Sequence, residues 1–405
     1  MSRKKERKLG SFSFSFLFFE KFYAMYYDVK RKIYRSDTKG LKEAISVLSK
    51  GGIIAFPTET VYGIGCDANN TNAIDRIYKL KKRKREKPLV MFLPRKEMID
   101  DFVRKPGKTG KMLYNHFFPG PLTFIMKAKK AVPEGLRSKK ETVSIRIPNY
   151  KFLNKLLRIY KKPLATTSAN ISGEKPTVDY RQINFDIDLL LSDNAIPNGL
   201  PSTVLDISCY PFFIRRKGAI NIFTIEKYLP TKVRFDSGIV FDVLFVCTGN
   251  ICRSPTAEGM LRRIFKKNGI GNVNVSSAGV NAGNGFLPSR NAVLAAAERG
   301  YNISKHRSKV VTEELVKRAD LILCMENYQK RVVKDLLLEG NEKVFLLSGY
   351  TGKKLEIEDP IGSGLDIYRK LARDIEQYVW KAAERIEKRF FKKSDKHSLK
   401  VNCNA

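Results

Sequence analysis

The stretch VLFVCTGNICRSP at residues 243–255 constrains this chain more than any other. An apolar run typical of a β-strand ends at Cys247, a loop of small residues leads to Arg253, and Ser254 and Pro255 open a helical pattern. A tight loop that ends at the start of a helix directs several backbone N–H groups inward, and the helix dipole adds positive potential. The pattern therefore predicts a binding site for a phosphate dianion.

Cys247 and Arg253 have complementary uses at such a site. The positive field would lower the pKa of the Cys247 thiol and make it a thiolate nucleophile. Arg253 can bind two phosphate oxygens in a bidentate fork. A lone cysteine is often only buried filler, but the strand before the loop and the helix after it favour the nucleophilic site. The residues expected to surround the phosphate are Thr248, Gly249, Asn250, Ile251, Cys252 and Ser254.

Residues 241–391 closely resemble the low-molecular-weight protein tyrosine phosphatases. Besides the loop, the resemblance rests on SSAG at 276–279 and on EDPIGSG at 358–364. It implies hydrolysis of a phosphoprotein through a phosphocysteine intermediate, without a cofactor. Family members place the general acid in such an Asp-Pro loop, so the resemblance makes Asp359 a catalytic residue beside Cys247 and Arg253.

Three enzymes share this fold: tyrosine phosphatase, protein-arginine phosphatase and arsenate reductase. In this family tyrosine phosphatases carry Ile where this chain has Ile251, whereas arginine phosphatases carry Thr. DPIGSGLDIYRK, from residue 359, looks more like the arginine phosphatases, because no aromatic residue follows Asp-Pro. We favour phosphotyrosine and keep phosphoarginine as the alternative, because residue 251 touches the site. Thiol-coupled arsenate reductases need two further cysteines, and Arg331 occupies the partner spacing expected after Cys324.

The N-terminal half carries polar motifs beside apolar runs, and its alternating strand and helix patterns predict an α/β sheet domain over 37–230. PTETVYG offers two threonine hydroxyls, TTSANISG offers hydroxyls and an amide, and RIP and RRKG add guanidinium groups. The basic run KLKKRKREK could hold polyphosphate, contact RNA or form a solvated loop. The residues alone leave these uses open.

Seven motifs in order closely resemble the YrdC-type threonylcarbamoyl-AMP synthases over nearly all of 37–225. They are FPTETVYGIGCDA, LKKRKREKPLVMFL, FPGPLTFIM, VSIRIPN, TTSANISG, PSTVLDIS and RRKGAI. The resemblance implies synthesis of threonylcarbamoyl-adenylate from L-threonine, bicarbonate and ATP, with Mg²⁺ helping to neutralise the triphosphate and pyrophosphate released. That product feeds the t6A modification of tRNA, which makes the t6A-transfer machinery and tRNA candidate partners.

The resemblance also assigns residues to the two substrates. Those assigned to ATP are Lys81, Arg83, Lys87, Ser168, Asn170 and Arg216. Those assigned to threonine are Thr58, Arg146 and Ser202, with Arg146 meeting the carboxylate. No protein side chain is expected to ligate a metal. Family members usually carry proline or a small residue after the signature arginine, whereas Lys84 and Arg85 follow here. The loop conformation, and the basic residue that meets the triphosphate, therefore stay open.

Composition sets broader limits. The 405 residues suggest two or three domains, and the net charge of +35 favours anionic partners, although solvated lysine faces would give the same excess. An RNA-binding module is the alternative for the N-terminal half, but PTETVYG and SAN have no use in an RNA platform. The six cysteines lack CxxC pairs, which disfavours zinc sites and disulfides and suits the reducing cytoplasm.

The fold class expected is therefore α/β in two domains, a YrdC-like twisted sheet at 37–230 and a doubly wound parallel sheet at 241–391. Residues 231–240 are expected to be a linker and 392–405 a frayed tail. Residues 1–36 are expected to be an extension, disordered or upstream of the real start, with Met25 as an alternative first residue. Its Phe-rich run is too short to span a bilayer and is interrupted by Glu20 and Lys21, so no membrane partner is expected.

Overall fold

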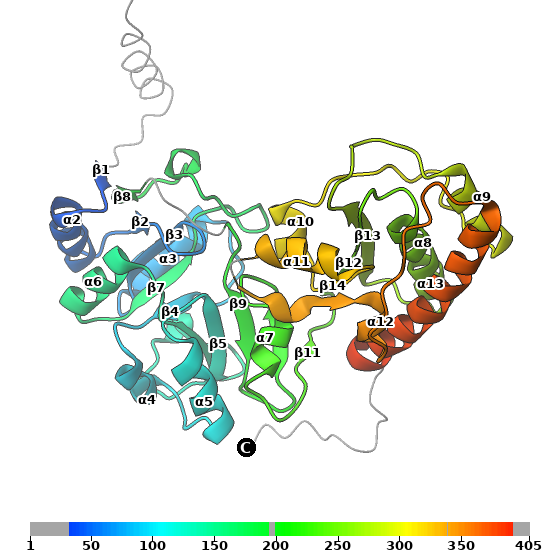
Figure 1. The fold of residues 1–405 in the computed structure, drawn as a ribbon. Helices are drawn as coiled ribbons and strands as arrows, with labels where there is room; N and C mark the ends of the chain where they lie inside the picture. The colour runs from blue at the N-terminus through cyan, green and yellow to red at the C-terminus, as the bar shows by residue number, and fades with distance from the viewer. Residues whose placement is uncertain (1–31, 194–198, 338, 392–405) are drawn as a thin grey trace, which may run out of the picture.

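The computed structural model describes residues 32–193, 199–337 and 339–391. Most of the predicted extension and the whole predicted tail lie outside these residues. Within them the chain forms two α/β halves that lie side by side (Figure 1). Residues 32–35, which we expected in the extension, instead form an edge strand of the N-terminal sheet, where they pair in parallel with residues 189–192.

The N-terminal sheet is mixed and, within the described residues, has eleven strands in the order β1-β8-β2-β3-β7-β4-β6-β5-β9-β10-β11. Both parallel and antiparallel pairs occur along it, as in β4 with β6 and β6 with β5. The strands are β1 Lys32–Arg35, β2 Ile54–Phe56, β3 Gly63–Asp67, β4 Val90–Phe92, β5 Leu122–Lys127, β6 Thr142–Arg146, β7 Leu164–Ser168, β8 Leu189–Ser192, β9 Thr203–Asp206, β10 Phe213–Arg216 and β11 Arg234–Phe235.

Helices cover both faces of this sheet because its strands alternate apolar residues to the two sides. Ile54 and Phe56 of β2 pack in a cluster with α2 and α6, whereas Ile53 and Ala55 pack in the larger cluster with α3 and α5. These helices are α2 Thr38–Ser49, α3 Thr71–Leu80, α5 Lys108–Phe117 and α6 Lys151–Tyr160. Two further helices are short: α4 Ile99–Phe102, and α7 Ile222–Glu226, which contacts the C-terminal half through Phe223 and Thr224.

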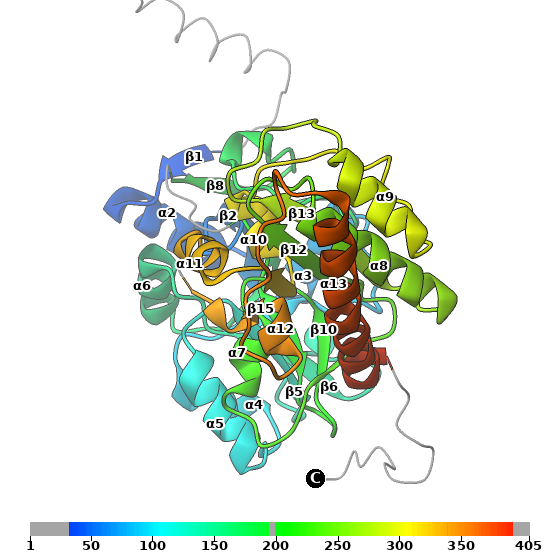
Figure 2. The ribbon, with the colours of Figure 1, turned by 45° about the vertical axis from the view of Figure 1, so that its right-hand side comes forward.

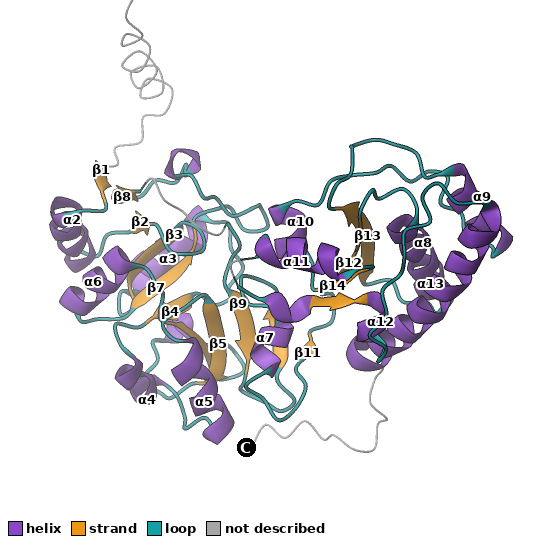
Figure 3. Cartoon of the chain, in the orientation of Figure 1, coloured by secondary structure: helices purple, strands orange, loops and turns teal. Residues whose placement is uncertain are grey.

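The C-terminal sheet has four parallel strands, in the order β13-β12-β14-β15 (Figure 3). Its first strand in sequence is therefore central, as in doubly wound folds. The strands are β12 Phe241–Cys247, β13 Val273–Gly279, β14 Leu321–Cys324 and β15 Val344–Leu346. The predicted parallel α/β sheet of this half is confirmed.

Two helical layers enclose this sheet. Phe241, Val243 and Phe245 of β12 pack with α8, α9 and α13, whereas Leu244 and Val246 pack with α10 and α11 on the opposite face. Figure 2 shows α8 and α13 together beside the sheet. The helices are α8 Arg253–Lys267, α9 Arg290–Glu298, α10 Glu313–Arg318, α11 Asn327–Asp335, α12 Leu347–Tyr350 and α13 Leu365–Ile386, which continues as a π-helical turn at Glu387–Phe391.

The predicted linker contributes to the packing between the halves. Arg234 and Phe235 within it form β11, which pairs with β10. The Phe235 ring lies 5.8 Å from that of Phe241 and 5.6 Å from that of Phe390, between ring centroids. Phe390 also stacks on Phe241 at 4.3 Å. The segment that joins the halves is therefore packed between them, and aromatic residues from both halves share one cluster.

Candidate active sites

The loop between β12 and α8 places Cys247 at the end of the central strand and Arg253 at the start of the helix. Asn250 has a φ of 55°, the left-handed conformation that Asn tolerates better than most residues. Its amide nitrogen donates to the Oγ atoms of Ser254 (2.9 Å) and Ser277 (2.8 Å), and its backbone N–H donates to Cys247 Sγ at 3.2 Å. These bonds hold the loop around the thiol.

Arg253 is almost fully buried, with a side chain 1 % exposed. One terminal nitrogen donates to Glu326 Oε2 (2.6 Å) and to the Ile357 carbonyl oxygen (2.8 Å). The other donates to Thr248 Oγ1 (3.2 Å) and to Asp359. Its Nε is buried without a hydrogen-bond partner in the described part of the chain. A buried donor of this kind beside the phosphate loop suits an oxyanion ligand.

The pKa of Cys247 shifts in the opposite direction to our expectation. Burial raises the pKa of this thiol, and contacts with Ser254, Arg253 and Asn250 offset the rise only in part. The main physical reason is burial, because Cys247 is only 2 % exposed, and the Arg253 guanidinium that would favour the thiolate is itself paired with Glu326 and Asp359. The expectation of a lowered pKa was wrong for this arrangement of side chains, because it considered only the loop and the helix.

Asp359 and Cys252 border the same loop. The Asp359 side chain is 34 % exposed and pairs with Arg253. Cys252 is buried, and its sulfur lies 3.2 Å from Ser289 Oγ and 3.5 Å from the Tyr368 hydroxyl. Ile251 packs at the edge of the core cluster of this half, so it is only partly buried. The predicted loop residues and the predicted acid are therefore brought together around Cys247.

In the N-terminal half, Thr58 and Arg146 belong to one buried network. Thr58 Oγ1 lies 2.8 Å from Thr60 Oγ1, which accepts from an Arg146 terminal nitrogen at 3.2 Å. The same guanidinium pairs with Glu59 at 2.8 Å and donates to the Gly120 carbonyl oxygen at 3.1 Å. Glu59 Oε2 is buried without a hydrogen-bond partner among the described residues. The network can accept both a carboxylate, at Arg146, and an ammonium group, at Glu59.

Ser202 and Arg216 form a second group. Arg216 donates to the Ser202 carbonyl oxygen and to its Oγ, each at 2.9 Å, and that Oγ lies 2.9 Å from Thr123 Oγ1. Desolvation by the surrounding protein lowers the pKa of Arg216 to about 10, although the side chain remains accessible to solvent. The charges of Arg146 and Arg83 contribute to that shift. Both charges thus act on Arg216, which favours an anion beside it.

The basic loop takes a conformation that the sequence left open. Lys81 is buried, and its ammonium group donates to the carbonyl oxygens of Ser168 (2.5 Å) and Asn170. Burial, and then the charge of Arg83, lower the pKa of Lys81 to about 7. Arg83 donates to the carbonyl oxygens of Lys87 (2.7 Å) and Pro88 (3.1 Å). Lys81 and Arg83 thus stabilise the loop through hydrogen bonds to backbone carbonyl oxygens, whereas the Lys87 side chain is exposed.

The amide of Asn170 also has a structural use, donating at 2.8 Å to the carbonyl oxygens of Ile171 and Glu174. Its Oδ1 is buried without a partner in the described segments. Lys84 and Arg85, the two residues that depart from the family pattern, are both exposed, and Arg85 pairs with Asp75 and lies over the Tyr78 ring.

No group of three or more His, Cys, Asp or Glu side chains that could hold a metal ion occurs in residues 32–193, 199–337 and 339–391. In the same residues no helix is both long and apolar enough to cross a membrane. Cys324 is fully buried in β14, and burial raises the pKa of its thiol, which does not suit the reactive second cysteine of an arsenate reductase.

Comparison with known proteins divides the chain into the same two halves as the structure. Residues 46–218 match the family of Sua5, YciO and YrdC described as "Telomere recombination", and residues 242–392 match the low molecular weight phosphotyrosine protein phosphatases. A threonylcarbamoyl-AMP synthase of Blochmanniella floridana is 33 % identical over 43 % of this chain and 94 % of its own length. A protein-arginine-phosphatase of Bacillus subtilis is 38 % identical over 36 % of this chain and 97 % of its own length.

The chain thus joins a domain of the YrdC-type synthase family to one of the low-molecular-weight phosphatase family.

The synthase domain does not cover all of its longer relatives. The threonylcarbamoyl-AMP synthase of Pyrococcus abyssi is 31 % identical over 47 % of this chain, and the match spans 57 % of that protein's length. A solved structure of a double variant of P. abyssi Sua5 is 21 % identical, with a TM-score of 0.51 over 85 % of this chain and 97 % of its own. At this identity the structural likeness shows the fold alone.

Some residues of both sites escaped the sequence analysis. Glu326 and Gln329 contact Arg253 and Thr248 respectively, the latter through Gln329 Nε2 at 3.1 Å. Glu326 ends the run DLILCME, which the sequence predicts as a strand, and the carboxyl ends of parallel strands are where such sheets bind ligands, so its position was a usable signal. Glu59 stood inside the quoted PTETVYG motif, but nothing in the motif marks it as the partner of Arg146.

Proposed function

We propose that one chain carries two enzymes, an L-threonylcarbamoyladenylate synthase and a protein phosphatase. The observation that carries the phosphatase is the position of Arg253 Nε, a buried donor without a protein partner in the described chain, beside Cys247. For the synthase it is the buried network in which Thr60 joins Thr58 to Arg146, with Glu59 Oε2 left without a partner among the described residues. Both sites are built for anions.

In the synthase, Arg146 would bind the threonine carboxylate, with Thr58 and Ser202 nearby. The threonine amine and bicarbonate combine into a carbamate with loss of water. A carbamate oxygen then attacks the α-phosphorus of ATP, the bond to the β-phosphate oxygen breaks, and pyrophosphate leaves. This chemistry needs two anions held together and negative charge neutralised on the triphosphate. Arg83, Lys87 and Arg216 would supply that charge, with Lys81, Ser168 and Asn170 shaping the turn beside it.

Mg²⁺, if it takes part, would arrive with the triphosphate, because oxygen ligands from ATP and water suit this ion. It would neutralise charge on the leaving pyrophosphate. We propose the t6A-transfer machinery as the consumer of the adenylate, with tRNA as a further partner.

In the phosphatase, the Cys247 thiolate attacks phosphorus while Arg253 and the loop amides bind the equatorial oxygens. The bond from phosphorus to the leaving group breaks as Asp359 gives that group a proton. Asp359 then removes a proton from water, which attacks the phosphocysteine and releases inorganic phosphate and free Cys247. The leaving group thus departs protonated in the first step, and the proton taken from water returns Asp359 to its acid form in the second.

Phosphoarginine is the substrate that we propose for this domain. The B. subtilis relative, matched over 97 % of its length, is a protein-arginine-phosphatase. Ile361 follows the Asp-Pro pair in place of an aromatic wall and is 64 % exposed. Both observations support the alternative over our first preference, phosphotyrosine. Ile251 is the one residue that still favours phosphotyrosine, because an apolar branched side chain packs well on a phenyl ring.

A substrate comparison tests this choice. We expect kcat/KM of the purified chain to be higher for phosphoarginine than for phosphotyrosine in peptides of matched sequence. Replacement of Ile251 by Thr should raise that ratio further. A preference for phosphotyrosine that Ile251→Thr diminishes would instead assign the domain to tyrosine phosphatases.

A further inference from the structure

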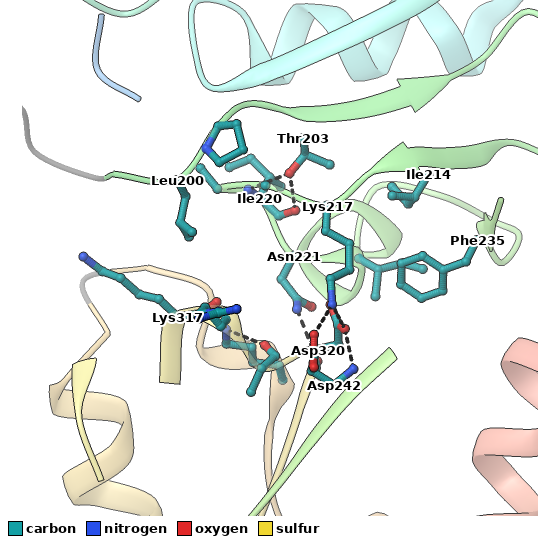
Figure 4. A pocket seen from close by; sticks show the side chains of 17 residues that line it. Leu200, Thr203, Ile214, Lys217, Ile220, Asn221, Phe235, Asp242, Lys317 and Asp320 are labelled. Carbon is teal, nitrogen blue, oxygen red and sulfur yellow. Dashed lines mark hydrogen bonds and ion pairs between the residues drawn. The ribbon is translucent and has the colours of Figure 1, made fainter. Parts of the chain in front are cut away.

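Lys217 crosses from the synthase domain to the phosphatase domain. It follows Arg216, the last residue of β10, and its ammonium group pairs with the carboxylates of Asp242 and Asp320, the latter at 2.6 Å. It also donates to the Val240 carbonyl oxygen at 2.8 Å. The two acidic residues are joined to each other, because the Asp242 backbone N–H donates to Asp320 Oδ2 at 2.8 Å. Figure 4 shows this cluster between the domains.

The same segment is held on its other side by the synthase site. Arg216 donates to both oxygens of Ser202. At Gly218 a Cβ would collide with the Pro201 carbonyl oxygen and the Thr203 amide, so the two backbones are in close contact. Thr203 Oγ1 donates to the Ile220 carbonyl oxygen at 2.7 Å and accepts from the Ile220 N–H at 2.9 Å. Residues 216–220 therefore cannot move without displacing residues 201–203.

At Lys217 itself the contact between the domains is ionic. A cavity of about 220 Å³ lies between the domains and is lined by Lys217, Thr203, Asp242 and Asp320, among others (Figure 4). The Asp320 side chain is 9 % exposed and that of Lys217 is 27 % exposed. A carboxylate buried to this degree needs its cation, so the pair persists. Beside the cavity, Asp242 and Asp320 fix the position of the Lys217 ammonium group.

We propose that Asp242 and Asp320 of the phosphatase domain, through Lys217, hold Arg216 in the synthase site. The phosphatase domain thereby completes the ATP side of its neighbour's active site. Lys217 is a positioning residue: it acts through Arg216 and touches no substrate. The proposal rests on the proposed synthase function.

The test measures threonine-dependent pyrophosphate release by the full-length chain. Lys217→Met should raise KM for ATP about tenfold, with a smaller change in kcat, because the effect of a displaced Arg216 falls on ATP binding. Lys217→Arg, which keeps the charge, should restore most of the lost affinity. Lys227→Met is the matched control, because Lys227 also crosses the interface, to Glu342, but contacts no residue of the synthase site among the interactions described. It should leave KM for ATP unchanged.

A double-mutant cycle separates positioning from a general structural role. If Lys217 acts through Arg216, Lys217→Met should have little further effect on KM for ATP in an Arg216→Ala background. Additive effects, or an unchanged KM in Lys217→Met, would overturn the proposal. Phosphatase activity reports on folding, and if Lys217→Met does not fold, Lys217→Met/Asp320→Asn removes the more buried of the two carboxylates that lose their cation and should show the same rise in KM. An inactive wild type would overturn the synthase function itself, whereas an active wild type with these variants unaffected overturns only the positioning.

Discussion

The Arg253 guanidinium donates to the carboxylate of Asp359, so the proposed phosphate-binding residue holds the proposed general acid. The two roles need different positions. Arg253 must bind the phosphoryl oxygens while Asp359 faces the leaving group. Since Glu326 and the Ile357 carbonyl oxygen also hold Arg253, the arginine is the better anchored of the pair. We therefore expect Asp359 to be the residue that moves when substrate binds.

Loss of Asp359 should affect poor leaving groups most. Asp359→Ala should lower kcat about 10²–10⁴-fold for an alkyl phosphate or a phosphoarginine peptide, because these leaving groups need a proton. A nitrophenyl phosphate should lose less. Asp366→Ala, at an exposed position in the first turn of α13, is the control and should be unaffected. Equal losses for good and poor leaving groups would contradict the acid role.

The reactivity of Cys247 should depend on the carboxylates around Arg253. Burial raises the pKa of the thiol, so the thiolate is scarce at neutral pH and alkylation by iodoacetamide should increase with pH, with a midpoint above the ~8.5 of free cysteine. Asp359→Asn removes one negative charge beside Arg253 and should shift the midpoint downward. Mass spectrometry of the modified peptide, as a function of pH, measures both. A wild-type midpoint below that of free cysteine would show that Arg253 and the loop contacts outweigh burial at this thiol.

Lys81 should make stability depend on pH. Its pKa is about 7 in the fold and returns to 10.5 on unfolding, so between these values the unfolded chain binds more protons. Stability of the wild type relative to Lys81→Met should therefore increase with pH across this window, by at most about 1.4 kcal/mol per unit. Urea unfolding at pH 6.5, 8 and 9.5 provides the comparison. A constant difference between the two proteins would mean that Lys81 stays protonated on the Ser168 and Asn170 carbonyl oxygens.

Replacement of Thr60 should raise KM for threonine and leave KM for ATP unchanged. Thr60 links Thr58 to Arg146, so Thr60→Val should misplace the guanidinium and raise KM for threonine by roughly tenfold, the effect of one charge-assisted contact. Thr142→Val is a matched control at the far end of β6, where the Thr142 hydroxyl bonds only to Ser138 among the contacts described. Steady-state kinetics with each substrate varied in turn measure both variants. A larger effect on ATP would contradict the assignment of this network.

The parts of the sites that could be predicted from the sequence are local. Cys247, Arg253, the end of the strand and the start of the helix lie within thirteen residues, so spacing alone carries their geometry. Glu326 and Ile357 contact Arg253 from more than seventy residues away in the sequence, and no local pattern predicts such partners. The direction of the Cys247 pKa shift was missed because it depends on how deeply the fold buries the thiol, which the local sequence does not show.

The segments at the domain edges differ from expectation for a related reason. Residues 32–35 and 234–235 are short and only half apolar, so their own sequences do not predict strands. They become strands because β8 and β10 present open edges to them. Pairing with a neighbouring strand therefore decides their structure, whereas the central strands of the two sheets carry apolar runs of their own.

The most direct test of two enzymes in one chain is to disable each site in turn. Both activities, threonine- and ATP-dependent pyrophosphate release and phosphate release from a phosphoarginine peptide, are measured on the same full-length preparations of wild type, Arg146→Ala and Cys247→Ser. We predict that wild type has both activities, that Arg146→Ala loses only pyrophosphate release, and that Cys247→Ser loses only phosphate release. A wild-type protein that lacks either activity, or a phosphatase activity that survives in Cys247→Ser, would contradict the account.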